Sequence, residues 1–113
     1  MRTAIIGSRN FSDWELMEKT LTQLSFNITE IVSGGAKGAD SLGEKYALMK
    51  NIPTKIYLPD WEKFGKSAGM IRNADIIKNS DFVIAFWDGI SKGTKHSIDL
   101  SKKTNKKLLV IRY

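Results

Sequence analysis

Five short apolar runs alternate along this chain with stretches in which apolar residues recur at helical spacing. The runs are Thr3–Ile6, Ile28–Val32, Thr54–Leu58, Asp81–Trp87 and Leu108–Ile111. The fourth run is almost wholly apolar, which is typical of a strand inside a parallel sheet that has helices on both faces. The third run alternates less regularly, and we interpret it as an edge strand. The pattern predicts five strands.

The clearest helix start follows the first run. Ser12 is the expected N-cap, and Glu15 stands three residues later, which together predict a capping box. Phe11 before the cap and Leu16 after it have the spacing of a hydrophobic staple. The apolar face of this helix is predicted to consist of Trp14, Met17, Leu21 and Leu24. We therefore place Trp14 in the core.

Three further helices are predicted. They span Ala39–Met49, Ser67–Lys78 and a segment from the loop Asp88–His96 to about Thr104–Asn105. The expected buried positions are Leu42, Tyr46, Ala47 and Met49 in the first of these and Ile71, Ala74 and Ile77 in the second. Pro53 ends the first, because proline lacks the N–H that a helix needs. Pro59–Lys66 is interpreted as a long polar and aromatic loop, a kind of segment that is often functional.

Strict alternation of strand and helix predicts a single α/β domain over residues 1–113. Such a chain forms a parallel sheet with right-handed crossovers and a layer of helices on each face. We predict the strand order 3-2-1-4-5. Ligands of these folds bind beyond the carboxyl ends of the strands, where the strand order reverses. The loops after the first, second and fourth strands are therefore expected to meet at one site.

These three loops carry glycine with hydroxyl or basic residues, and the turns at the opposite edge, around Ser25–Asn27 and Asn79–Ser80, do not. Ser33–Asp40 lies between a strand and a helix, where backbone N–H groups at the positive end of the helix dipole suit a phosphate. The residues expected to contact a ligand are Gly7, Ser8, Arg9, Ser33, Gly34, Gly35, Lys37, Gly38, Asp40, Arg72, Asn73, Asp88, Gly93, Thr94 and Lys95.

Each group has an expected role and an alternative. The glycines let the backbone approach a phosphate. The negative charge of the phosphate is neutralised by Arg9, Lys37 and Arg72, and Ser8 and Thr94 add hydroxyl donors. Asp40 or Asp88 accepts hydrogen bonds from ribose hydroxyls. The alternatives are a plain tight turn for the glycine loop, a surface ion pair with Asp75 or Glu62 for Arg72, charge compensation at a helix start for Asp40, and a structural role for His96.

Composition narrows the function classes. Of the 113 residues 42% are hydrophobic and 27% charged, and there is no cysteine and one histidine, His96. Disulfides, thiol catalysis and a multi-histidine metal site are excluded. We expect no metal and no cofactor. We expect neither a membrane span nor a leader segment, and therefore a cytoplasmic protein.

The net charge of +6 favours an anionic partner. Much of the excess lies in Lys102, Lys103, Lys106 and Lys107. We interpret that cluster as a solvated helix end, where lysines complement the dipole. Nucleic-acid binding remains an alternative, although lysines gathered near one end do not form the basic track with interleaved aromatics that single strands require.

The motifs, taken together and in order, resemble the small YspA-like branch of the SLOG superfamily. They are Gly7-Ser8-Arg9, the stretch Ser33–Asp40, Asp60-Trp61, Gly69–Asn73, Phe86–Gly89 and Gly93–His96. The superfamily includes LOG-type nucleotide phosphoribohydrolases, lysine-decarboxylase-like proteins, the DNA-processing protein A fold and sensors of nucleotide-derived signals. The resemblance implies a Rossmann-like fold and a nucleotide-type ligand, and it does not fix an activity.

One position departs from the hydrolases. LOG-type enzymes carry Gly-Gly-x-Gly-Thr-x-x-Glu after the fourth strand; Gly93-Thr94 match this motif, and Ser97 stands where the glutamate would be. Serine cannot act as a carboxylate base. We therefore expect no catalytic residue and a sensor, carrier or sequestering protein for an ADP-ribose-like, cyclic or other nucleotide-derived ligand. The alternative is a nucleoside-monophosphate N-glycosidase in which Asp40, Asp88 or, least favoured because it lies deeper in the helix, Asp99 replaces the glutamate.

A last expectation concerns assembly. Trp61, Phe64 and Met70 form an apolar group in or near the long loop, where a monomer would carry polar residues. SLOG-like proteins also commonly pair. We predict a homodimer or a higher homo-oligomer, with this segment at the interface or over the ligand pocket.

Overall fold

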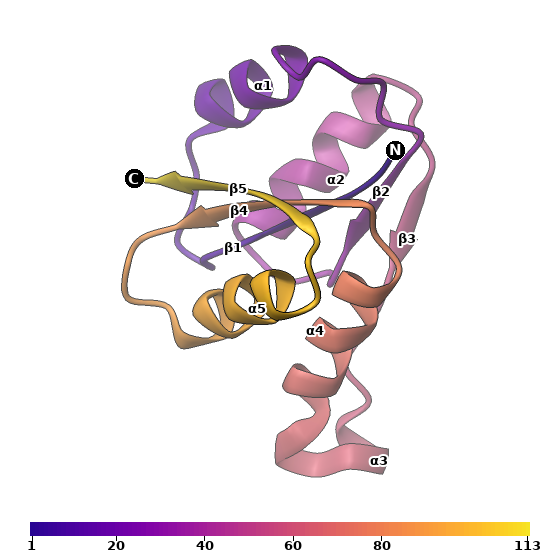
Figure 1. Ribbon diagram of the computed structural model, residues 1–113, viewed down its shortest axis with the longest axis vertical. Coiled ribbons are helices and arrows are strands. Elements are labelled where there is room, and N and C mark those ends of the chain that lie inside the picture. Colours follow the sequence, from indigo (N-terminus) through magenta and orange to yellow (C-terminus); the bar gives the residue numbers. More distant parts are fainter.

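A computed structural model describes all residues, 1–113, as one three-layer α/β domain (Figure 1). The elements are β1 (Arg2–Gly7), α1 (Trp14–Thr22), β2 (Glu30–Ser33), α2 (Ala39–Met49), β3 (Thr54–Ile56), α3 (Trp61–Phe64), the 3₁₀ turn η1 (Gly65–Ser67), α4 (Ala68–Lys78), β4 (Phe82–Trp87), α5 (Lys92–Lys103) and β5 (Lys107–Arg112). All five strands are parallel in the order β3-β2-β1-β4-β5. The predicted fold, strand order and edge position of β3 are confirmed.

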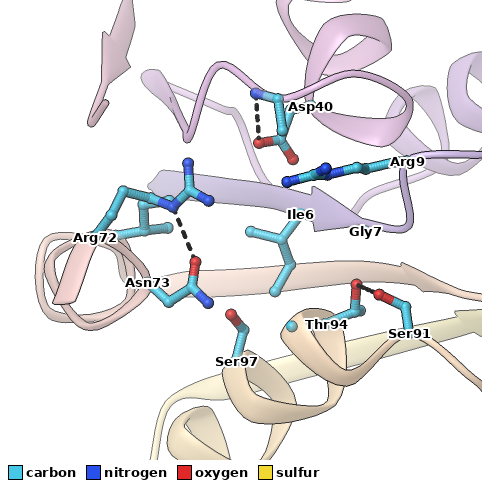
Figure 2. A pocket seen from close by; sticks show the side chains of 12 residues that line it. Ile6, Gly7, Arg9, Asp40, Arg72, Asn73, Ser91, Thr94 and Ser97 are labelled. Carbon is cyan, nitrogen blue, oxygen red and sulfur yellow. Dashed lines mark hydrogen bonds between the residues drawn. The ribbon is translucent and has the colours of Figure 1, made fainter. Parts of the chain in front are cut away.

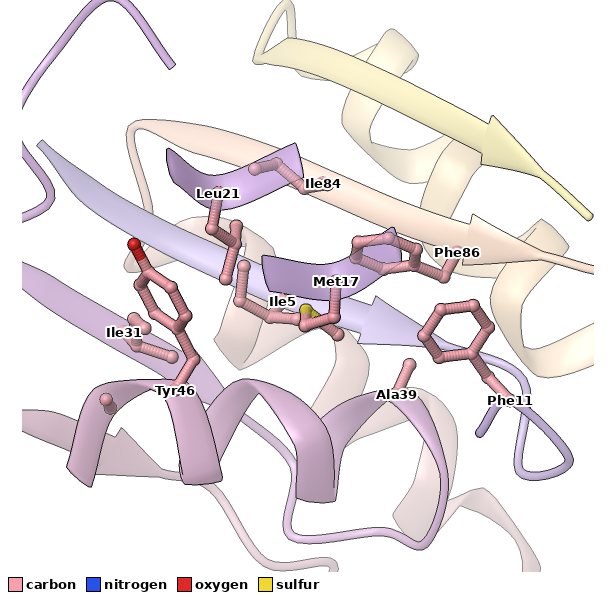
Figure 3. Close-up of a cluster of buried hydrophobic side chains, with 10 residues drawn as sticks. Ile5, Phe11, Met17, Leu21, Ile31, Ala39, Tyr46, Ile84 and Phe86 are labelled. Atoms are coloured by element: carbon pink, nitrogen blue, oxygen red, sulfur yellow. The ribbon is translucent and has the colours of Figure 1, made fainter. Parts of the chain in front are cut away.

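The sheet separates two apolar cores. Helices α1 and α2 cover one face, and α4 and α5 cover the other (Figure 1). Neighbouring residues of a strand alternate between the cores: Ile5 and Ile84, paired in register, face α1 and α2, and Ala4 and Val83 face the other helices. Figure 3 shows the first core, in which Met17 of α1 packs among the strand residues. This two-sided burial explains the unbroken apolar pattern of β4.

The start of α1 differs from the prediction by one residue. Asp13, and not Ser12, is the N-cap, and its carboxylate accepts a hydrogen bond from the Leu16 N–H at 3.0 Å. A carboxylate at this position also interacts favourably with the helix dipole, which a hydroxyl does not. Glu15 is thus out of register for the capping box. Phe11 is buried against Phe86, with ring centroids 4.7 Å apart, and so belongs to the core.

The segment predicted as a loop is helical. Asp60 accepts from the Lys63 N–H at 3.1 Å and starts the four-residue helix α3, which η1 joins to α4. A helix of one turn is too short to show a period of 3.6 residues, so the sequence pattern missed it. β3 ends two residues earlier than predicted, at Ile56.

Two predicted buried positions are wrong. Ala74 is exposed, because α4 turns Ala68, Ile76 and Ile77 toward the sheet. Met49 is 55% exposed, since the last turn of α2 lies outside the core. None of the helices combines the length and the apolar character that crossing a membrane requires.

Candidate functional site

A cavity of about 110 Å³ lies where the carboxyl end of β1 meets the starts of α2 and α5 and one side of α4 (Figure 2). Its lining residues are Ile6, Gly7, Arg9, Ala36, Asp40, Arg72, Asn73, Ile76, Ser91, Gly93, Thr94 and Ser97. The strand order reverses between β1 and β4, so this is the position expected for a ligand of this fold.

A wider surface hollow of about 450 Å³ adjoins the cavity. Three of its lining residues, Arg9, Ser91 and Gly93, also line the cavity. The others are Ser8, Asn10 and Asp88. None of the six is hydrophobic. The hollow therefore offers hydrogen-bonding groups and no hydrophobic side chain.

The loops that form the site are held together by direct backbone contact. Gly38 has φ +81°, and a Cβ atom there would overlap the carbonyl oxygens of Ser8 and Arg9. The Ser8 hydroxyl accepts from the Asp88 N–H at 3.3 Å. The loops after β1, β2 and β4 thus meet as predicted, and Gly38 is needed for that packing.

Asp40, in the first turn of α2, is 5% exposed and forms part of the cavity wall. Its Oδ2 atom accepts from the N–H groups of Gly34 and Ala36, both at 3.2 Å. Burial raises the pKa of the Asp40 carboxyl to about 6, although these two hydrogen bonds and the charge of Arg72 act in the opposite direction. Two amide groups of the glycine-rich loop, which we expected to bind phosphate, therefore bind a carboxylate of the protein.

Arg72 reaches the same loop from α4. Its Nη1 donates to the Gly34 carbonyl at 2.7 Å, and its Nε donates to the Asn73 side-chain oxygen at 3.0 Å. A Cβ atom at Gly34 would lie 2.5 Å from that Nη1, so this glycine makes room for the arginine. Burial lowers the pKa of Arg72, Asp40 raises it and nearby Arg9 lowers it further.

The alternative of a surface ion pair for Arg72 is not what the structure shows. The ion pairs of the chain are Arg2–Asp81 and Lys95–Asp99. Arg72 is instead fixed at the cavity by a carbonyl and an amide oxygen, and the nearby Asp40 carboxylate favours its charged form without a direct ion pair.

The start of α5 forms the opposite wall. Asp88 Oδ1 accepts from the N–H groups of Ile90 and Ser91, at 2.9 and 2.8 Å, and these bonds lower the pKa of the Asp88 carboxyl. The next amides, those of Gly93 and Thr94, donate no hydrogen bond within the protein. They lie at the positive end of a 12-residue helix, a position that favours an anion.

Hydroxyl groups complete this wall. The Thr94 and Ser91 hydroxyls are 3.2 Å apart and hydrogen-bonded to each other. Ser97 lies one turn further along α5 and is 3% exposed. Its hydroxyl lines the cavity, has no hydrogen-bond partner in the protein and is turned toward the cavity in Figure 2.

Some predicted site residues line neither the cavity nor the hollow. They are Ser33, Gly34, Gly35, Lys37, Gly38 and Lys95. Ser33 donates to Glu44 at 3.1 Å, and Lys95 pairs with Asp99 at 2.8 Å. The other predicted residues line the cavity, the hollow or both: Gly7, Ser8, Arg9, Asp40, Arg72, Asn73, Asp88, Gly93 and Thr94.

Sequence reasoning did not select Ile6, Asn10, Ala36, Ile76, Ser91 or Ser97 as ligand contacts. Ser91 carried a readable signal, since it follows Asp88 and precedes a helix. The two isoleucines carried none, because buried strand and helix residues look alike wherever they lie. No group of three or more His, Cys, Asp or Glu side chains is placed to hold a metal ion.

Comparison with known proteins bears on the first half of the site. The model of the YspA, cpYpsA-related SLOG family matches residues 1–64. The chain belongs to this family. The match spans β1 to α3 and includes the loops Gly7–Asn10 and Ser33–Asp40, so the predicted resemblance to SLOG proteins is confirmed there. The cavity residues of α4 and α5 lie beyond the residues that the SLOG model matches.

One curated relative extends the likeness. The Gene 61 protein of Mycobacterium phage D29 is 32% identical over 112 residues, which cover 90% of this chain and 89% of that protein. The similarity to this phage protein therefore extends over most of the present chain, and not only over the residues that the SLOG model matches. No solved structure matches.

Proposed function

We propose that this SLOG protein binds a nucleotide or nucleotide-derived ligand through its phosphate, as a sensor, carrier or sequestering protein. The observation that supports the proposal is the convergence of three positive groups on one cavity. Arg9, Arg72 and the amino-terminal end of α5 approach it from separate elements (Figure 2). Asp40 is the single carboxylate among the lining residues.

The two arginines differ in how many of their N–H groups are free to bind a ligand. Arg72 is held in place by the Gly34 carbonyl and Asn73. Arg9 is exposed and donates no hydrogen bond within the protein. A guanidinium with free N–H groups in a planar fork is suited to bidentate binding of a phosphate. Arg9 is therefore the residue expected to contribute most of the charge-assisted contact.

The adjoining hollow suits the sugar of a nucleotide. Ser8 supplies a hydroxyl, Asn10 an amide and Asp88 a carboxylate, and all three line it. Ribose hydroxyls both donate and accept hydrogen bonds, so they match this set of groups. The cavity would hold the phosphate and the hollow the sugar.

Isothermal titration with nucleoside monophosphates, ADP-ribose and cyclic nucleotides tests the proposal. Arg9→Ala should weaken binding by about 10- to 150-fold, because a charge-assisted hydrogen bond contributes roughly 1.5–3 kcal/mol. The matched control is the double variant Lys102→Ala/Lys103→Ala, which removes two charges from the far end of α5 and should leave affinity unchanged. The proposed site is contradicted if Arg9→Ala binds as tightly as the wild type, or if the control variant loses as much affinity as Arg9→Ala.

A second candidate function is N-glycosidic hydrolysis of a nucleoside monophosphate. It is favoured by Asp40, a cavity-wall carboxyl whose pKa of about 6 is suited to proton transfer near neutral pH. Against it, Ser97 stands where the hydrolases carry glutamate, and Asp40 is already engaged by Gly34 and Ala36. Chromatography of each monophosphate after incubation should show no free base. Base release that is lost in Asp40→Asn would establish the enzyme.

A further inference from the structure

We infer that this site recognises a sugar bearing a terminal phosphate monoester and is indifferent to the base. The inference rests on the proposed function and narrows it. It separates nucleoside monophosphates and sugar phosphates from cyclic nucleotides and ADP-ribose, in which every phosphate is substituted on two oxygens, as a cyclic diester or within a pyrophosphate. The observations that carry it are the size of the cavity, its hydrogen-bond donors and the composition of the hollow.

The cavity is the size of a headgroup and not of a nucleotide. Its volume of about 110 Å³ is well above the roughly 10–15 Å³ that a single water molecule requires and well below the roughly 300–1,000 Å³ of pockets that enclose whole ligands. One phosphate fits. A phosphodiester would need room for substituents on two of its oxygens, whereas a monoester needs room for one, toward the hollow that shares Arg9, Ser91 and Gly93 with the cavity.

The donors around the cavity favour a group with three free oxygens and two negative charges. Arg9 and Arg72 supply positive charges, which the Asp40 carboxylate offsets in part, and the free amides of Gly93 and Thr94 supply backbone donors. Ser97, a residue that is 3% exposed, adds a hydroxyl that has no protein partner, so its hydrogen bond is available to a ligand. Each free oxygen of a monoester accepts such bonds, and esterification of a second oxygen removes one acceptor and one charge.

No aromatic side chain lines the cavity or the hollow, so neither offers a base a ring to stack on. The three apolar cavity residues, Ile6, Ala36 and Ile76, carry no ring, and the hollow has no apolar residue at all. Sequence-independent base binding rests on stacking with aromatic side chains, which contributes about 1–3 kcal/mol per base. Without such a surface the base should contribute little affinity, and purines and pyrimidines should bind alike.

The test is calorimetry on the full chain with two sets of probes. Ribose 5-phosphate and the 5′-monophosphates of adenosine, guanosine, cytidine and uridine should bind within about fivefold of one another. Adenosine 3′,5′-cyclic monophosphate and ADP-ribose should bind about 30-fold or more weakly, from the loss of one charge-assisted contact and part of a second.

A pair of serine variants tests the cavity donor. Ser97→Ala should weaken ribose 5-phosphate binding by about 5- to 10-fold through the loss of one hydrogen bond. Ser101→Ala is the matched control, because Ser101 lies one turn further along α5 and donates to the Ser97 carbonyl at 2.7 Å, away from the ligand. Circular dichroism melting confirms that both variants are folded. Equal affinity in Ser97→Ala and wild type overturns the assignment of this donor.

The outcomes separate this inference from the proposed function. If cyclic AMP or ADP-ribose binds as tightly as AMP, or one base is preferred more than tenfold, the inference is wrong and the nucleotide site stands. If no probe of either set binds at millimolar concentration, the proposed function itself is wrong and the inference falls with it.

Discussion

Asp40 carries the largest electrostatic cost of any residue in the site. Its carboxyl is buried and its pKa is raised to about 6, so the folded state holds the proton more tightly than the unfolded chain does. Stability contributed by this group is therefore present below about pH 4 and is lost as the pH rises toward 6. The two amides of the glycine-rich loop offset part of the cost of ionisation.

Asp40→Asn should raise stability at pH 7.5 and change it little near pH 4. The asparagine oxygen keeps an acceptor for the amides of Gly34 and Ala36 and removes the buried charge, and a pKa of about 6 against an ordinary value near 4 corresponds to a gain of up to about 3 kcal/mol. Urea denaturation at both pH values measures the free energy of unfolding. An equal gain at both, or a loss at pH 7.5, contradicts the assignment.

Gly38 and Gly93 offer a matched pair of glycine substitutions. Gly38→Ala should destabilise the fold by about 2–4 kcal/mol, because it combines a positive φ with overlap against the Ser8 and Arg9 carbonyls. Gly93→Ala places its Cβ in open space in the first turn of α5 and should be neutral or stabilising by up to about 1 kcal/mol. Thermal melting of the two proteins measures the difference. Similar melting temperatures would show that the loops after β1 and β2 do not need their close approach.

At the scale of elements, α3 is the feature that departs most from a self-contained domain. It lies beyond the start of α4, at the far end of the molecule from the sheet (Figure 1). Trp61, Phe64 and Met70 are all exposed there. Large apolar side chains gathered in one place on a surface mark an interaction site more often than isolated ones do.

We propose that this apolar group mediates homodimer or higher homo-oligomer formation. The double variant Trp61→Ser/Phe64→Ser should then be monomeric in light scattering at micromolar concentration, while the wild type is not. Leu48→Ser is the control, because Leu48 is 81% exposed on α2, outside this group, and its replacement should leave the assembly intact. A wild-type protein that is monomeric in this measurement contradicts the proposal.

At the scale of the whole molecule, the charge of +6 is distributed in a way that does not favour nucleic acid. Lys106 is tied to the Ser80 carbonyl at 2.8 Å at the end of α4, and so has a structural role. Lys102 and Lys103 occupy the last turn of α5, where they complement the helix dipole. Arg9 and Arg72 belong to the cavity.

Single-stranded DNA should bind only weakly. Fluorescence anisotropy with a labelled 20-nucleotide thymidine strand should give a dissociation constant weaker than about 10⁻⁵ M near physiological salt, in the range of non-specific contacts. Lys102→Ala/Lys103→Ala should weaken even this binding, and Arg9→Ala should not. Submicromolar affinity that falls steeply with salt would favour the nucleic-acid alternative, since each contacted phosphate of a single strand contributes a slope of about 0.7.

The sequence by itself determined the parallel sheet, its strand order and the meeting of three loops at its carboxyl edge. These follow from local patterns: β4 is apolar throughout because both its faces are covered, and alternation with helices leaves a right-handed parallel topology. The same reasoning selected Arg9 and Asp40, because charged residues in the loops and helix starts after strands gather at one edge, whereas Arg72 was selected from its place early in a predicted helix.

Only the tertiary structure decided what those residues bind. The amides of Gly34 and Ala36 were expected to meet a ligand, and the carboxylate of Asp40 meets them instead; Gly34 lacks a side chain so that Arg72 can approach. The cavity therefore lies closer to α5 than expected, and Ser97 of that helix faces it. Hydrogen-bond partners depend on the distances between segments far apart in the chain, and packing sets those distances, which no periodic pattern of apolar residues records.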